Sequence, residues 1–273
     1  MEKTAQISGV KSTQTSPFVF KIARGYVSAM EQPSSTPPTE NTRAINAPNV
    51  VIGLAALFIG IHAGTGLLSP ERYLDILIRF SFIPARYQFP GSLPGSPVSE
   101  WISPISHAFL HGNWMHVLTN SVWMLAFGSA LAWRFRAVRF LLFSGACAGA
   151  GAAMHYFFNS DSLIPTIGAS AAISGQMAAV GRFAFSAGGP LSRAARQQGE
   201  QAFVHPAEPL SQLLKNSSAL IFIGAWFVMN LAFGLSDSGL AGEGNRIAWE
   251  AHMGGFLAGL ALFPLFDPVQ KST

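Results

Sequence analysis

Hydrophobic residues occur in six long blocks between positions 49 and 266, and stretches richer in charged residues, Gly and Pro separate them. Each block has roughly 20 residues, the length that an α-helix needs to cross the hydrocarbon core of a bilayer. Because the inside of a membrane offers no water to bind backbone N–H and C=O groups, such blocks form helices and not open strands. The sequence therefore predicts an all-α membrane protein with six spanning helices, over residues 49–68, 106–133, 138–158, 166–187, 217–235 and 249–266.

The N-terminal segment before the first block has a different composition. Residues 1–46 are rich in Ser, Thr, Gln and Pro, and the run PSSTPPTENT covers residues 33–42. Such a segment cannot bury enough apolar surface to fold, and no apolar region follows its first charges closely, as a secretory signal would require. We expect a disordered tail over residues 1–46, a six-helix membrane domain over residues 47–268 and a short second tail over residues 269–273.

Positive charges are distributed unevenly between the two sides that this topology defines. All but four of the 17 Lys and Arg residues lie in the N-terminal tail, around the connections after the second and fourth blocks, or after the sixth block. The other four are Arg72, Arg79, Arg86 and Arg246, on the opposite side. Because Lys and Arg accumulate in cytoplasmic loops, we expect both tails to be cytoplasmic.

The composition supports a membrane protein and excludes several other classes. Only 11% of the residues are charged, against about 25% in soluble domains. The net charge of +4 does not indicate nucleic-acid binding, because the basic residues flank apolar blocks and form no patch. The single cysteine, Cys147, excludes an internal disulfide and a cysteine-based metal cluster.

Polar residues inside three of the blocks suggest a functional site, because such groups are costly in a membrane and usually face the interior of a helix bundle. His107, His111, His116 and Asn120 lie along the predicted helix 106–133. His116 and Asn120 share one face of it, and His107 and His111 share another. Two zinc ligands could use the latter spacing, but no third ligand is evident, so we predict no metal site.

The fourth and sixth blocks carry a serine and a histidine near their starts. Ser170 follows Gly168 near the beginning of the fourth block, where free backbone N–H groups favour negative charge. His252 lies in the first turn of the sixth block. A hydroxyl and an imidazole at two helix ends can form a catalytic pair if the two helices meet.

Small residues at matching intervals predict that these two helices do meet. Gly255 and Gly259 in the sixth block, and Ala171 and Gly175 in the fourth, are each four positions apart. Such small faces let membrane helices approach closely. We expect this contact to bring His252 to Ser170.

Three motifs in these blocks resemble those of the rhomboid family of intramembrane proteases. They are H-x4-H-x3-N in the second block, G-x-S in the fourth and A-H-x2-G-x3-G in the sixth, in the order that the family has. The motif residues are His111, His116 and Asn120; Gly168, Ala169 and Ser170; and Ala251, His252, Gly255 and Gly259. The resemblance covers about residues 50–268 of the chain.

The resemblance implies a serine endopeptidase that cleaves transmembrane proteins near the membrane boundary with a Ser–His dyad. Ser170 would be the nucleophile and His252 the general base, while His116 and Asn120 would form the oxyanion hole. Supporting roles fall to His111, Gly168, Gly255 and Gly259. The implied partners are transmembrane substrates and the lipid bilayer, with no cofactor, metal or nucleic acid, and the implied location is a bacterial inner membrane.

Three alternatives remain open at this stage. Ser174, one turn further along the fourth block, competes with Ser170 as nucleophile. The protein could also be a catalytically inactive rhomboid-like protein that binds membrane clients, although the usual sign of that class is loss of the serine or the histidine. A transporter or channel would need charged residues along a path through the helices, and the blocks contain almost none.

Overall fold

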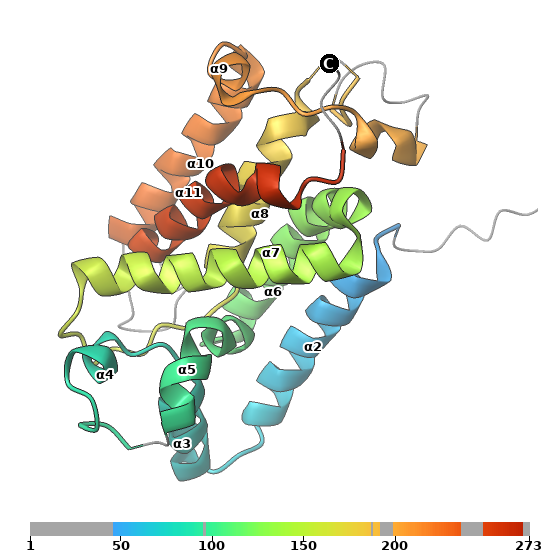
Figure 1. Ribbon diagram of the computed structural model, residues 1–273. Coiled ribbons are helices and arrows are strands. Elements are labelled where there is room, and N and C mark those ends of the chain that lie inside the picture. Colours follow the sequence, from blue (N-terminus) through green and yellow to red (C-terminus); the bar gives the residue numbers. More distant parts are fainter. Residues whose placement is uncertain (1–45, 95–96, 187, 192–198, 236–247, 270–273) are drawn as a thin grey trace, which may run out of the picture. The chain divides into compact units, whose positions relative to one another are not determined.

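The computed structural model describes residues 46–94, 97–186, 188–191, 199–235 and 248–269, and in this part of the chain helices dominate (Figure 1). The expected tails, residues 1–46 and 269–273, lie almost entirely outside the described residues. The longer helices are α2 (Asn49–Thr65), α3 (Pro70–Phe80), α5 (Pro97–Ser106), α6 (Trp114–Trp123), α7 (Ser129–Phe158), α8 (Ser170–Ala184), α10 (Ser217–Leu235) and α11 (Trp249–Phe266). The short elements are α4 (Pro84–Gln88), α9 (Leu210–Leu213), the 3-10 helices η1 (His107–Phe109) and η4 (Gly199–Val204), and the π-helix η2 (Met124–Gly128).

The predicted helix over residues 106–133 is wrong at its start. Helix α6 begins only at Trp114, so His107 lies in the 3-10 turn η1 and His111 lies in the loop that follows it. The cause is a helix cap: the side chain of Asn113 accepts a hydrogen bond from the backbone N–H of His116 at 2.8 Å. His107 and His111 therefore do not share a helix face with each other or with His116.

The predicted fourth helix also begins later than hydropathy suggests. Thr166 pairs with Phe82 in an isolated two-way β-bridge, with N–O distances of 3.1 and 2.8 Å. Gly168 has φ +116°, a backbone conformation that residues with a side chain rarely adopt. Both features hold the chain outside a helix until Ser170, where α8 starts.

Helix length and hydropathy support membrane crossing most clearly in one place. Within the described part of the chain, the continuous run Trp114–Phe158 is the one helix both long and apolar enough to cross a membrane, and Asn49–Thr65 and Ser217–Ala232 are shorter apolar helices. Arg136 divides that run, since its φ of 65° and ψ of 170° are not helical. The connection predicted between the second and third blocks is thus reduced to a kink.

Helices α7, α8 and α11 pack together at the centre of the described structure (Figure 1). Every residue of α8 from Ala171 to Ala184 is buried. A Cβ atom on Gly255 would clash with the carbonyl oxygen of Ala171, and one on Gly259 would clash with that of Gly175. The small-residue contact predicted between the fourth and sixth blocks is therefore present. A Cβ atom on Gly175 would also clash with the buried thiol of Cys147 in α7, so all three helices meet closely here.

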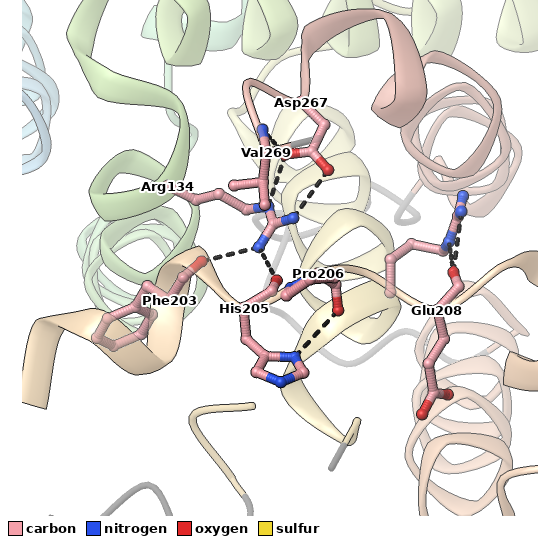
Figure 2. A network of polar contacts seen from close by, with 8 residues as sticks. Arg134, Phe203, His205, Pro206, Glu208, Asp267 and Val269 are labelled. Carbon is pink, nitrogen blue, oxygen red and sulfur yellow. Dashed lines mark hydrogen bonds and ion pairs between the residues drawn. The ribbon is translucent and has the colours of Figure 1, made fainter. Parts of the chain in front are cut away.

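A buried arginine ties the end of α11 to two other segments (Figure 2). The Arg134 side chain, which is 0% exposed, donates from Nε and Nη2 to the two carboxylate oxygens of Asp267, each at 2.8 Å. Its Nη1 donates to the backbone carbonyls of Phe203 and His205 at 2.9 and 2.7 Å. The sequence places Arg134 in the connection after the second block, whereas the structure buries it and uses four of its five N–H groups in these hydrogen bonds.

Candidate active site

The hydroxyl of Ser170 and the imidazole of His252 meet at the starts of two packed helices. Ser170 is the first residue of α8, and His252 lies in the first turn of α11. The Oγ atom of Ser170 is 2.7 Å from Nε2 of His252. This distance is that of a hydrogen bond, and it is the geometry in which an imidazole can take the proton of a nucleophilic hydroxyl.

The other ring nitrogen of His252 has a partner that sequence reasoning missed. Its Nδ1 lies 2.6 Å from Oδ1 of Asn230, a buried residue of α10. Asn230 is a polar residue inside the apolar block 217–235, and such a residue indicates a functional site there, as in the other blocks. The sequence could not show that it faces His252, because the two residues lie on different helices.

Glu250, two residues before His252 on α11, does not orient the imidazole, because residues two positions apart on a helix point in different directions. Its carboxylate points instead toward His155, with Oε2 3.7 Å from Nδ1 of that residue. The side chain of Asn159 lies 3.3 Å from the same Nδ1 atom. These three residues form a separate polar group on the wall of the cavity described below.

His116 and Asn120 both lie close to Gly168, the first residue of the G-x-S motif. They are four residues apart on α6 and share one face, as predicted. A Cβ atom on Gly168 would lie 2.6 Å from Nε2 of His116 and 3.5 Å from Nδ2 of Asn120. In the described part of the chain, Nδ2 of Asn120 is buried without a hydrogen-bond partner. A buried donor of this kind is costly unless a ligand oxygen can accept from it.

His111 lies behind His116 and does not line the cavity. The two rings pack edge to face, with centroids 5.1 Å apart. The backbone carbonyl of His111 accepts a hydrogen bond from Nδ1 of His62 at 3.1 Å. His111 thus packs against His116 and supports its position, and the ring of His111 also packs against Phe58 of α2.

The hydroxyl of Ser174, the competing nucleophile, is engaged within its own helix. It donates to the backbone carbonyl of Ser170 at 2.8 Å, one turn earlier in α8. Such a bond holds the hydroxyl against the helix backbone. Ser170, and not Ser174, has the imidazole within hydrogen-bond distance.

The candidate site opens into a cavity of about 780 Å³. One part of its wall is polar and includes Ser170, His252, His116 and Asn120. Another part is apolar and is formed by Trp123, Phe127, Ile173, Met177, Trp226 and Met229. The cavity can therefore hold an apolar side chain beside a group that reacts with the serine.

Comparison with known families identifies the class of protein that this fold and site define. Residues 98–267, more than half of the chain, match the Rhomboid domain. The chain therefore belongs to the rhomboid family, whose members are embedded in membranes and are intramembrane proteases of membrane proteins or inactive relatives of them. No curated protein matches the chain significantly.

Proposed function

We propose that the protein is an intramembrane serine endopeptidase that hydrolyses a peptide bond of transmembrane protein substrates near the membrane boundary. The observation that carries the proposal is the 2.7 Å contact between Oγ of Ser170 and Nε2 of His252, at the wall of a cavity large enough for a peptide segment. An inactive, client-binding relative would not need this pair, and neither member of it is lost here.

In the proposed reaction, Nε2 of His252 takes the hydroxyl proton as Oγ of Ser170 attacks the scissile carbonyl carbon. The carbonyl oxygen becomes an oxyanion, which accepts hydrogen bonds from the free Nδ2 of Asn120, from His116 and from the backbone N–H of Ser170. The C–N bond then breaks, and the imidazolium returns the proton to the leaving amine. A water molecule then attacks the acyl-enzyme carbonyl while Nε2 of His252 takes its proton. The imidazolium returns that proton to Oγ of Ser170 as the ester bond breaks.

The proposal includes the six-span arrangement of the membrane domain over residues 47–268. Helices α2, α6 with α7, α8, α10 and α11 correspond to the six apolar blocks, with Arg136 between the second and third. The charge distribution supports cytoplasmic tails at both ends. The location we propose, a bacterial inner membrane, rests on the family resemblance and the six-span form. A helical substrate hides its carbonyls in backbone hydrogen bonds, so substrates with small or helix-breaking residues near the cut are favoured.

Active-site labelling tests the proposal directly. We expect a fluorophosphonate probe to label the detergent-solubilised wild type and Ser174→Ala, and not Ser170→Ala, because only the hydroxyl beside His252 is activated. His252→Ala should label far more slowly than the wild type. Absence of label on folded wild-type protein would contradict the proposal and favour an inactive protein that binds membrane clients.

Replacement of Gly168 by Ala should impair the proposed oxyanion hole while leaving the dyad in place. The new Cβ would press on His116 and approach Asn120, and the φ of +116° would be strained. Since loss of one oxyanion donor costs about 100-fold or more in kcat, we expect a fall in kcat of that order for cleavage in liposomes. Gly53→Ala in α2, where a Cβ meets nothing within 4 Å, is the matched control and should cleave like the wild type. An unchanged kcat in Gly168→Ala would show that His116 and Asn120 do not stabilise the oxyanion.

A further inference from the structure

We infer that Asn230 is a positioning residue that fixes the tautomer and orientation of His252, an inference that rests on the function proposed above. The amide of Asn230 contacts the first turn of α11 at two points. Its Oδ1 is 2.6 Å from Nδ1 of His252, and its Nδ2 donates to the backbone carbonyl of Trp249 at 3.3 Å. One side chain of α10 thus binds both the imidazole and the backbone of the turn that carries it.

The two contacts together determine which way the amide faces. If the amide were rotated by 180°, its oxygen would face the carbonyl oxygen of Trp249, and two acceptors would repel each other. The bond to Trp249 therefore leaves Oδ1 directed at His252. Because an amide oxygen only accepts hydrogen bonds, Nδ1 of His252 must carry the hydrogen.

This choice of tautomer decides whether the dyad can work. A neutral imidazole has one protonated and one unprotonated nitrogen. With the hydrogen held on Nδ1, Nε2 has a free lone pair and accepts the hydroxyl proton of Ser170 across the 2.7 Å contact. In the other tautomer Nε2 would carry a hydrogen toward the serine, and the hydroxyl would have no base. Serine proteases with a triad assign this task to a carboxylate; here a neutral amide performs it.

The location of Asn230 agrees with a role in the site. The residue is 6% exposed and lies in an otherwise apolar helix, where an amide is costly unless it is bonded. It also lines the cavity that holds Ser170. Among the described residues, the ionisable groups that act electrostatically on His252 are His116 of α6 and Glu250 of α11, and both stay unchanged in the variants below.

The test compares two replacements of Asn230 by cleavage kinetics in liposomes over a range of pH. Asn230→Leu removes the acceptor while keeping a similar volume, and we expect kcat to fall about 10- to 100-fold with KM within about twofold, because a hydrogen bond to a group that becomes charged is lost. Asn230→Asp keeps an acceptor at Nδ1 of His252 but puts an oxygen against the carbonyl of Trp249, so it should retain more of kcat than Asn230→Leu and less than the wild type. Its acidic limb of kcat against pH should move to higher pH, since a carboxylate stabilises the imidazolium.

A matched control separates positioning from general packing of α10. Asn216 precedes the start of α10, whereas Asn230 lies near its other end. The amide of Asn216 also binds a neighbouring segment, donating from Nδ2 to the carbonyl of Phe185 at 3.1 Å. Asn216→Leu should therefore leave the pH profile and kcat unchanged. A loss of kcat in Asn216→Leu equal to that in Asn230→Leu would show a packing effect and overturn the inference.

Two further results would overturn it. One is a kcat of Asn230→Leu within twofold of the wild type. The other is an unshifted acidic limb in Asn230→Asp, which decides the question alone if the leucine variant does not fold. Ser170→Ala belongs in the same series: if it still cleaves, the proposed function fails, whereas if it is inactive and Asn230→Leu is fully active, only the role of Asn230 fails.

Discussion

Replacement of Ser170 by Ala is expected to lower the rate of cleavage of a single-span membrane substrate on the order of 10⁴- to 10⁶-fold. The variant loses the atom that forms the covalent bond, and its small methyl group fits where the hydroxyl lay, so the fold should persist. The measurement is cleavage of the substrate in liposomes, with circular dichroism and thermal unfolding to verify that the variant is folded.

The effects of Ser170 and His252 should not add. Because Oγ of Ser170 and Nε2 of His252 act as one unit across 2.7 Å, the double variant is expected to be about as slow as either single variant. Ser174→Ala is the control for loss of a nearby hydroxyl and should stay active. Cleavage by Ser170→Ala at a rate near that of the wild type would remove the basis of the proposed function.

Replacement of Arg134 by Met is expected to lower the free energy of unfolding by about 3–5 kcal/mol, because it leaves a largely buried carboxylate without its counter-charge. Asp267 is 10% exposed and would lose both hydrogen bonds from the guanidinium. The carbonyls of Phe203 and His205 would lose their donor as well (Figure 2). Chemical or thermal unfolding in detergent measures the effect.

Two controls frame the Arg134 prediction. Arg139→Met removes an exposed arginine of the same helix and should change the unfolding free energy little. The double variant Arg134→Met/Asp267→Asn removes both charges and should be more stable than Arg134→Met alone. Equal stability of Arg134→Met and Arg139→Met would show that the buried ion pair contributes no more than a surface charge.

Hydropathy predicts best where local sequence alone fixes the structure. The ranges predicted for α10 and α11 are those observed, because uninterrupted apolar runs end at clear polar or charged positions. The contact between α8 and α11 was also predictable. Gly255 and Gly259 admit a close neighbour, and Ala171 and Gly175 offer one at the same spacing.

Features that depend on contacts between distant segments were not predictable in the same way. The late start of α8 follows from the pairing of Thr166 with Phe82, which no local pattern marks. Arg134 reads as a loop charge until Asp267, at the other end of the domain sequence, is seen beside it. The role of Asn230 likewise requires knowing which face of α10 meets α11.

The start of the predicted helix 106–133 was wrong although a local signal, the N-cap residue Asn113, marks the true start. Asn113 is a good N-cap residue and follows a glycine, yet the apolar run on both sides led to a helix starting at Ser106. The cap separates His107 and His111 from the helix that carries His116 and Asn120. Capping residues therefore deserve more weight than hydropathy at the ends of apolar blocks.

The packing of Cys147 against Gly175 has a practical consequence for spectroscopy. It is the sole cysteine of the sequence, and its thiol is enclosed between α7 and α8. The native cysteine therefore needs no replacement before labelling. A cysteine introduced at an exposed site, such as Trp101 or Ile221, would react with maleimide dyes or nitroxide labels while Cys147 stays enclosed. Distances between such labels can then report on the movement of α5 or α10 without first altering the interior of the protein.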